Sequence, residues 1–152
     1  MHLDHFEISV AKDTLTQAFA TDLNGLLEQV FGWRGSLRRV EHPKFGETTE
    51  LTYAIDRGFR LIIREGPQAL QPGQEDHLGF AVDFDEFGRL SEACGRFASQ
   101  HRRTELSYFD QGRPTRIDLG DREYQTFFIR FLLPIWFQFE TTHQKRRSGE
   151  AP

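Results

Sequence analysis

The chain has 152 residues, of which 38% are hydrophobic and 28% charged, and its formal net charge is −4 at pH 7. This size is typical of one globular domain or of two small modules that share a core, and the charge gives no reason to expect nucleic-acid binding. A single cysteine, Cys94, excludes an intrachain disulfide. No stretch approaches the ~20 apolar residues of a membrane span, and no signal-peptide pattern is present, so we expect a cytoplasmic protein.

A short strand and an amphipathic helix are predicted first. Residues 3–10 alternate between apolar and polar side chains, as in a strand that is buried on one face. Asp13 or Thr14 is expected to cap the start of the helix, and Gly32 and Gly35 its end. Apolar residues recur along this helix at spacings of three and four: Leu15, Phe19, Leu23, Leu26, Leu27 and Val30.

Three strands complete the first half of the chain. They are predicted at residues 37–41, 48–56 and 59–65. The turn sequence Asp56-Arg57-Gly58 indicates that the last two form a hairpin. The first half therefore has the order β-α-β-β-β. Residues 66–75, which include two prolines and two glycines, are predicted to be a linker.

The second half is interpreted as another β-α-β-β-β module. Residues 77–82 predict a strand, and Asp85 is expected to cap a helix whose apolar face includes Cys94 as inert core. Pro134 separates the last two strands, because proline cannot donate a hydrogen bond to a sheet. Further strands are expected at 104–109, 115–119, 122–131 and 135–142. We thus expect a single domain made of two modules, 3–65 and 76–142, followed by a flexible tail at 143–152.

Each half opens with the same short sequence. Asp4-His5-Phe6-Glu7-Ile8-Ser9-Val10 and Asp76-His77-Leu78-Gly79-Phe80-Ala81-Val82 share the pattern Asp-His-apolar-x-apolar-x-Val, and their histidines are 72 residues apart. A repeat of half the chain length is typical of a duplicated unit. A pseudo-twofold axis could bring the two histidines together, and paired imidazoles are a common start to a metal site.

Two β-α-β-β-β modules that each open on a histidine resemble the vicinal oxygen chelate superfamily. That group includes glyoxalase I, fosfomycin-resistance thiol transferases, extradiol dioxygenases and bleomycin-binding proteins. The resemblance covers about residues 3–142 and also rests on the closing strand Trp136-Phe137-Gln138-Phe139-Glu140. It implies an α+β fold in which the two modules form a cup-shaped mixed sheet around a divalent metal ion. It also implies a homodimer, as many members are.

The resemblance implies which residues would bind the metal. His5 and His77 occupy the ligand positions of the two first strands. The third ligand would come from the closing strand, where an alignment without gaps places Gln138. Glu140 shares the face of Gln138, because side chains two apart on a strand point the same way, and its negative charge makes it the better ligand chemically. In the first module Glu65 lies near the corresponding position, with the opposite side-chain parity.

Further residues on the same faces suit catalysis. Glu7 follows His5 and is the candidate base or partner of a metal-bound histidine. Tyr124 is the candidate catalytic hydroxyl. Arg60, Arg64 and Arg130, all in predicted strands, could hold an anionic group or lie on a solvated face. Gly79 and Ala81 also lie on the His77 side of their strand, where small residues leave room for a ligand.

Three functions follow from the resemblance. The first is a metal-dependent enzyme, a glyoxalase-like lyase or isomerase or a ring-cleaving dioxygenase. It would use Fe, Mn, Ni or Zn on a small molecule with two adjacent oxygens. The second is a metal-free protein that binds an antibiotic or aromatic ligand. The third is a catalytically silent member whose cup is filled by its own phenylalanines. None of the three involves nucleic acid or a membrane as a partner.

Overall fold

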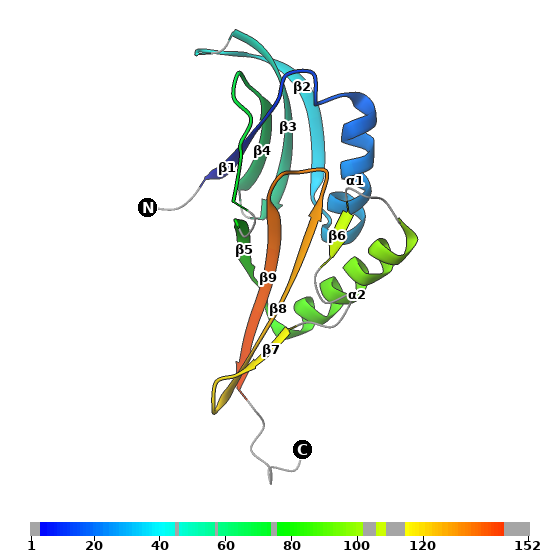
Figure 1. Cartoon of the computed structure of the whole chain (residues 1–152), viewed down its shortest axis with the longest axis vertical. Helices are drawn as coiled ribbons and strands as arrows, with labels where there is room; N and C mark the ends of the chain where they lie inside the picture. The colour runs from blue at the N-terminus through cyan, green and yellow to red at the C-terminus, as the bar shows by residue number, and fades with distance from the viewer. Residues whose placement is uncertain are drawn as a thin grey trace. The chain divides into compact units, whose positions relative to one another are not determined.

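The computed structural model describes residues 4–44, 46–56, 58–73, 76–101, 106–108 and 115–144 (Figure 1). The chain divides into two compact units, Met1–Pro72 and Gly73–Pro152. The division falls inside the segment predicted to be a linker. Each unit combines one sheet with one helix, which confirms the α+β class. No helix among the described residues combines the length and the hydropathy needed to cross a membrane.

Unit 1 has the element order predicted for the first half. Its sheet has the strand order β1-β4-β3-β2, in which β1 and β4 are parallel and the other pairs are antiparallel. Helix α1 is part of the crossover connection that parallel strands such as β1 and β4 require. The elements are β1 (His5–Val10), α1 (Gln17–Phe31), β2 (Arg34–His42), β3 (Gly46–Asp56) and β4 (Phe59–Glu65).

Unit 2 repeats this topology with one strand in two pieces. The strand order is β5-β9-β8-β6, and β7 also pairs with β8. Because β6 and β7 pair with opposite ends of β8, together they occupy the place that β2 takes beside β3 in unit 1. The elements are β5 (His77–Ala81), α2 (Phe84–Gln100), β6 (Leu106–Tyr108), β7 (Thr115–Asp118), β8 (Arg122–Phe131) and β9 (Trp136–Gln144). Strand β9 thus extends two residues into the predicted tail, and residues 145–152 lie outside the described part.

Both helices begin at a different residue from the one predicted. Helix α1 is capped by Thr16, whose hydroxyl oxygen accepts the N–H of Phe19 at 3.1 Å. Asp13 instead adopts a left-handed backbone conformation with φ 64°, which delays the first turn. Helix α2 is capped by Asp83, which accepts the N–H of Glu86 at 2.8 Å. Asp85 lies in the first turn, where a negative charge interacts favourably with the helix dipole.

Only the first of the two glycines predicted to end α1 does so. Gly32 is the C-cap, with φ 73°, a conformation that favours glycine. Gly35 belongs to β2, where a Cβ atom would lie 2.5 Å from the ring of Tyr53 and 2.6 Å from the side chain of Asn24. Glycine is therefore required at position 35 because the Tyr53 ring, whose hydroxyl donates to Asn24, approaches the backbone there.

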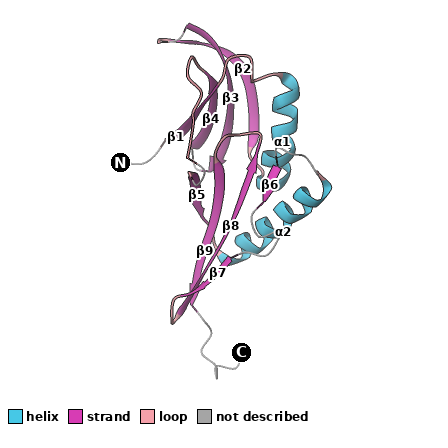
Figure 2. Cartoon of the chain, in the orientation of Figure 1, coloured by secondary structure: helices cyan, strands magenta, loops and turns pink. Residues whose placement is uncertain are grey.

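In each unit the helix lies along one face of the sheet, and the core is between them (Figure 2). Cys94 is buried in this core in unit 2, and burial raises the pKa of its thiol, which fits an inert packing role. Much of the phenylalanine content packs here, with ring contacts such as Phe127 against Phe139 at 5.1 Å. Among the residues that the structure describes, the buried phenylalanines are Phe87, Phe97, Phe127, Phe131, Phe137 and Phe139.

Candidate functional site

The candidate residues of unit 1 lie on the sheet face opposite the helix. Ile8 and Val10 are buried on the helix side, so the alternation of strand β1 turns His5 and Glu7 to the other face. The parallel register pairs His5 with Arg60 and Ser9 with Arg64, which brings two arginines to this face. The predicted side-chain parity of this strand is therefore correct.

His5 is held by the preceding aspartate. Its Nδ1 lies 3.0 Å from Asp4 Oδ2, and Arg60 Nη2 donates to the same oxygen at 2.6 Å. Hydrogen bonds from His5 and Arg60 lower the pKa of Asp4, so the carboxylate is ionised and can only accept. The Nδ1 atom of His5 therefore carries a proton, which it donates to Asp4, and Nε2 is directed away from Asp4. This tautomer, held by a carboxylate, is the one that metal-binding histidines use.

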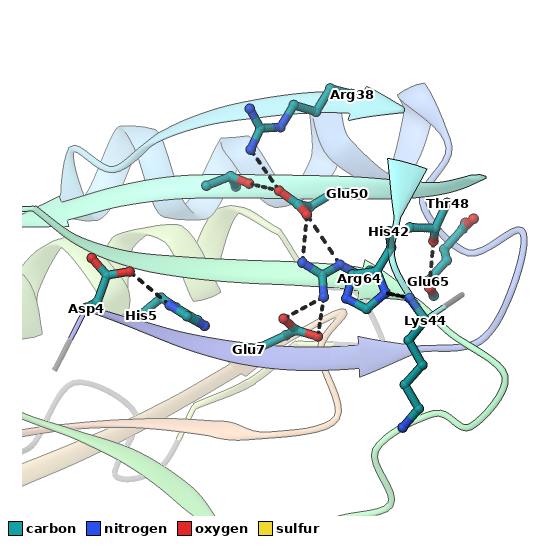
Figure 3. A network of polar contacts seen from close by, with 11 residues as sticks. Asp4, His5, Glu7, Arg38, His42, Lys44, Thr48, Glu50, Arg64 and Glu65 are labelled. Atoms are coloured by element: carbon teal, nitrogen blue, oxygen red, sulfur yellow. Dashed lines mark hydrogen bonds and ion pairs between the residues drawn. The ribbon is translucent and has the colours of Figure 1, made fainter. Parts of the chain in front are cut away.

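Glu7 is bound by an arginine at the centre of a larger cluster (Figure 3). Arg64 Nη1 donates to the two Glu7 oxygens at 2.8 and 2.7 Å. The same guanidinium donates through Nη2 to Glu50 at 2.9 Å. Glu50 also accepts from Arg38 at 2.9 Å and from the hydroxyl of Thr52 at 2.8 Å. We call these five residues the Arg64 network.

Within the Arg64 network, Glu50 and Arg64 are shielded from water. Burial of Glu50 would raise its pKa, but hydrogen bonds from Arg38, Arg64 and Thr52 outweigh burial and lower the pKa to about 2. The Glu50 and Arg64 side chains are only 5% and 12% exposed. The Glu7 side chain is more exposed, at 30%, and hydrogen bonds from Arg64 hold its carboxylate in one orientation.

Glu65 has the opposite parity, as predicted, and lies on the helix side. Its Oε1 accepts the backbone N–H of Leu15 at 2.7 Å, and its backbone carbonyl accepts the hydroxyl of Thr48 at 2.7 Å. The residue is buried. Glu65 therefore anchors the segment that leads into α1, and this structural role explains its burial without a metal.

The candidate residues of unit 2 share one face of its sheet. The parallel register of β5 and β9 pairs Gly79 with Gln138 and Ala81 with Glu140. His77 lies on the same face as these residues, two positions before Gly79. The predicted parity of Gln138 and Glu140 is thus correct, and the small side chains of Gly79 and Ala81 leave the strand open beside them.

Phe128 and Trp136 are neighbours of His77, and Arg130 packs on Trp136. The Phe128 ring makes an edge contact with the His77 ring at 5.8 Å. Trp136, the register partner of His77, has the guanidinium of Arg130 4.7 Å from its ring centroid. A guanidinium held over an aromatic ring keeps its charge and its outer N–H groups available for an anion.

Tyr124, Gln138 and Glu140 interact directly with one another. The Tyr124 hydroxyl donates to Glu140 Oε2 at 2.8 Å, and Gln138 Nε2 donates to the Tyr124 oxygen at 2.9 Å. Burial and the Glu140 carboxylate raise the pKa of Tyr124, so its hydroxyl stays protonated at neutral pH. Tyr124 therefore acts here as a hydrogen-bond donor to Glu140.

The chemical types of the candidate donor atoms suit a divalent metal. His5 in unit 1 and His77 in unit 2 supply imidazole nitrogen, and Gln138 and Glu140 supply oxygen, a mixture that Mn(II), Fe(II), Ni(II) and Zn(II) accept. Among the described residues, no three His, Cys, Asp or Glu side chains form a group that could hold a metal ion.

Some residues of these faces were not predicted from the sequence. Asp4 could have been found, because it precedes the histidine in the repeat. Its counterpart Asp76 has a different role, since it accepts the N–H of Gly73 at 2.7 Å and closes a turn. Glu50 carried no signal in the sequence, and neither did Thr126, whose hydroxyl accepts from Gln138 Nε2 at 3.2 Å. Their partners come from neighbouring strands and depend on the register.

A pocket of about 620 Å³ lies elsewhere in unit 1. Charged side chains of both signs line it, among them Lys12, Arg39, Lys44 and Glu47. It includes neither His5 nor Glu7, so it is separate from the face described above.

No protein-family model and no curated protein sequence matches the chain. Solved structures do match. A fosfomycin resistance protein FosX from Listeria monocytogenes is 13% identical, with 93% of each chain covered and a TM-score of 0.58. FosX from Mesorhizobium loti is 18% identical, with 92% of this chain and 91% of that chain covered and a TM-score of 0.54. The Listeria protein has also been crystallised with Mn(II) and sulfate, and a variant of it with Mn(II) and 1S,2S-dihydroxypropylphosphonic acid.

Proposed function

We propose that this chain, which has the fold of the vicinal oxygen chelate superfamily, is a divalent-metal-dependent enzyme that acts on a small molecule with two adjacent oxygens. The observation that supports the proposal most directly is in unit 2. There His77, an amide oxygen and a carboxylate lie on one face of two paired strands, beside the small residues Gly79 and Ala81.

The metal would be bound by His5, by His77 and by an oxygen from Gln138 or Glu140. The tautomer of His5 supports this role, because its Nδ1 proton is held by Asp4. When bound, the metal would polarise an oxygen of the substrate as a Lewis acid. Glu7 is the base we propose on the His5 face, with Arg64 fixing the direction of its carboxylate.

The positive charge of Arg130, which lies over the register partner of His77, supports the substrate class that we propose. Arg130, held over Trp136, would bind an anionic group such as a phosphonate or carboxylate. The Mn(II) and dihydroxypropylphosphonate in the FosX structure agree with a small anionic ligand that has vicinal oxygens. We therefore place the redox-neutral version, a glyoxalase-like lyase or isomerase, before a ring-cleaving dioxygenase. A homodimer, common in the superfamily, is part of the same proposal.

Metal binding and catalysis can be tested together. We expect the wild-type chain to bind about one equivalent of Mn(II), Fe(II), Ni(II) or Zn(II). His5→Ala and His77→Ala should each weaken binding strongly, whereas His42→Ala, which changes a half-buried histidine at the end of β2, should not. Dicarbonyl, epoxide-phosphonate and catechol compounds would then be assayed with the metal-loaded protein. Equal metal binding by all three variants would contradict the proposal.

A metal-free binding protein is the second candidate. Gln138, at the position expected to bind the metal, is neutral, and Glu140 already accepts a hydrogen bond from Tyr124. Both features weaken the affinity that an anionic ligand would give. This candidate predicts that anionic aromatic compounds raise the melting temperature equally with and without EDTA, and that Arg130→Met removes the effect.

A further inference from the structure

The pocket of unit 1 lies on the sheet face that α1 packs against, opposite the face of the candidate metal ligand in β1. Glu65 has the parity of the buried residue Ile63. Thr49 pairs with Arg39 and lies two positions before the buried residue Leu51, so both are on the helix side. Figure 1 shows the hairpin of β2 and β3 extending beyond the start of α1. The pocket therefore lies beside this hairpin, and all its lining residues belong to unit 1.

Hydrogen bonds between segments hold the walls of the pocket in place. The N–H of Gly66 donates to the Val10 carbonyl at 3.0 Å, which holds the chain after β4 beside the end of β1. The hydroxyl of Thr48 donates to the Glu65 carbonyl at 2.7 Å and ties β3 to the end of β4 (Figure 3). The pocket is therefore formed by the fold itself, as ligand pockets usually are.

One oxygen of the Glu65 carboxylate is open to this pocket. Oε1 accepts the N–H of Leu15 at 2.7 Å. Oε2 has no hydrogen-bond partner among the described residues, and it is not sealed from solvent. Because Glu65 is only 9% exposed and lines the pocket, Oε2 is reached from the pocket. A carboxylate that is buried to this extent gains most from a charged hydrogen-bond donor.

The lining of the pocket carries charges of both signs. Its three cations and three anions are Lys12, Arg39, Lys44, Asp13, Glu47 and Glu65. Arg39 and Glu47 pair with each other at 3.4 Å. Lys12 is exposed and has no ion pair among the described residues, so its ammonium group is available to a ligand.

A ligand that carries both charges satisfies such a lining. A simple anion would meet the carboxylate of Glu65, and a simple cation would meet three basic side chains. An apolar ligand would take charged groups out of water without replacing their hydrogen bonds. The volume of about 620 Å³ is that of a pocket for a small organic molecule, not for a single ion.

We propose that this pocket binds a small zwitterion that has an ammonium and a carboxylate group, of the class of short peptides and free amino acids. The ammonium group of the ligand donates to Glu65 Oε2, and its carboxylate faces the ammonium group of Lys12. The site is independent of the proposed metal site, because its residues lie on the other side of the sheet of unit 1.

The first experiment titrates the ¹⁵N-labelled full chain with L-alanyl-L-alanine and follows the backbone amide signals by nuclear magnetic resonance. We expect a Kd of ~1 mM or tighter, which a ligand of about eleven non-hydrogen atoms can reach. The largest shifts should be at Lys12, Thr49 and Gly66. No shifts at ~10 mM ligand, or shifts centred on His5 and Glu7, would overturn the proposal.

Two derivatives of the same peptide test the roles of its charges. N-acetyl-alanyl-alanine lacks the ammonium group and should bind ~10-fold or more weakly, because the Glu65 carboxylate loses a charged donor. Alanyl-alanine amide lacks the carboxylate and should bind ~2- to 5-fold more weakly, because it loses an exposed ion pair. Equal binding of the acetylated peptide and the free peptide would overturn the proposal.

Variants of the chain test the two residues that contact the ligand. Glu65→Gln keeps an acceptor for the Leu15 N–H but removes the charge, and it should lower the affinity by ~10-fold or more. Lys12→Met should lower it by ~2- to 5-fold. Arg34→Met, which removes an exposed cation at the other end of β2, is the matched control and should leave it unchanged.

Melting curves without ligand show whether each variant folds. Unchanged affinity in a folded Glu65→Gln would overturn the proposal. If Glu65→Gln does not fold, the comparison of the free and acetylated peptides on the wild type decides, since it changes nothing in the protein.

Discussion

Arg64 is the residue on which the polar face of unit 1 depends. It forms ion pairs with both Glu50 and Glu7, and the side chains of Arg64 and Glu50 are only 12% and 5% exposed. We expect Arg64→Met to reduce the free energy of unfolding by ~3–5 kcal/mol, because it leaves a buried carboxylate short of its partner. Urea unfolding measures the change. Arg39→Met, which removes an exposed ion pair with Glu47, should cost less than ~1 kcal/mol.

The pair of Glu50 and Arg64 also predicts how the stability of the fold depends on pH. The pKa of Glu50 is lowered in the folded chain to about 2 from an ordinary value of 4.5. A lowered carboxyl pKa stabilises the fold above the unfolded pKa, and this stability is lost as the pH falls from 4.5 toward 2. We expect the wild type to lose up to ~3 kcal/mol more than Glu50→Gln across this window. Parallel pH profiles of the two proteins in urea would contradict the assignment.

At the residue scale, the sequence predicted which side chains share a face but not what they contact. The parities of His5, Gln138 and Glu65 follow from strand periodicity alone and are correct. Contacts such as Glu7 with Arg64 depend on which strands are neighbours and in which register. These are set by packing across the sheet, which alternation within one strand does not encode.

The helix caps provide a test at the scale of elements. Asp83 accepts a backbone N–H of α2, whereas Asp85 interacts only through its charge in the first turn. Asp83→Ala should therefore lower the stability by ~1 kcal/mol, and Asp85→Ala by less than half of that. Thermal melting of the two variants, with the wild type alongside, decides between the observed cap and the one predicted from sequence.

The order and type of the elements could be predicted because each has a local signature. The repeat, the helical spacing of apolar residues and the turn signals are all local. The start of α1 could not be predicted, because the backbone N–H of Leu15 donates to the side chain of Glu65, fifty positions further along the chain. The division of one strand into β6 and β7 was also missed, since only the pairing of both with β8 reveals their equivalence to β2.

At the scale of the whole molecule, the duplication places one histidine in each unit. In the proposed function both histidines are metal ligands, and only the folded chain would bind the metal. We expect Mn(II) at ~100 times its Kd to raise the free energy of unfolding by about 2.7 kcal/mol, following mass action. Differential scanning calorimetry checks this, and His5→Ala and His77→Ala should each lose the effect. An equal gain in His77→Ala would place the metal elsewhere.

The central claim is that His5 and His77 bind the same metal ion, and it can be measured directly. Electron spin echo spectroscopy of bound Mn(II) detects the nitrogen of each coordinated imidazole. We predict two imidazoles in the wild type, one in His5→Ala and one in His77→Ala. Two imidazoles in either variant, or no bound Mn(II) in the wild type, would contradict the account.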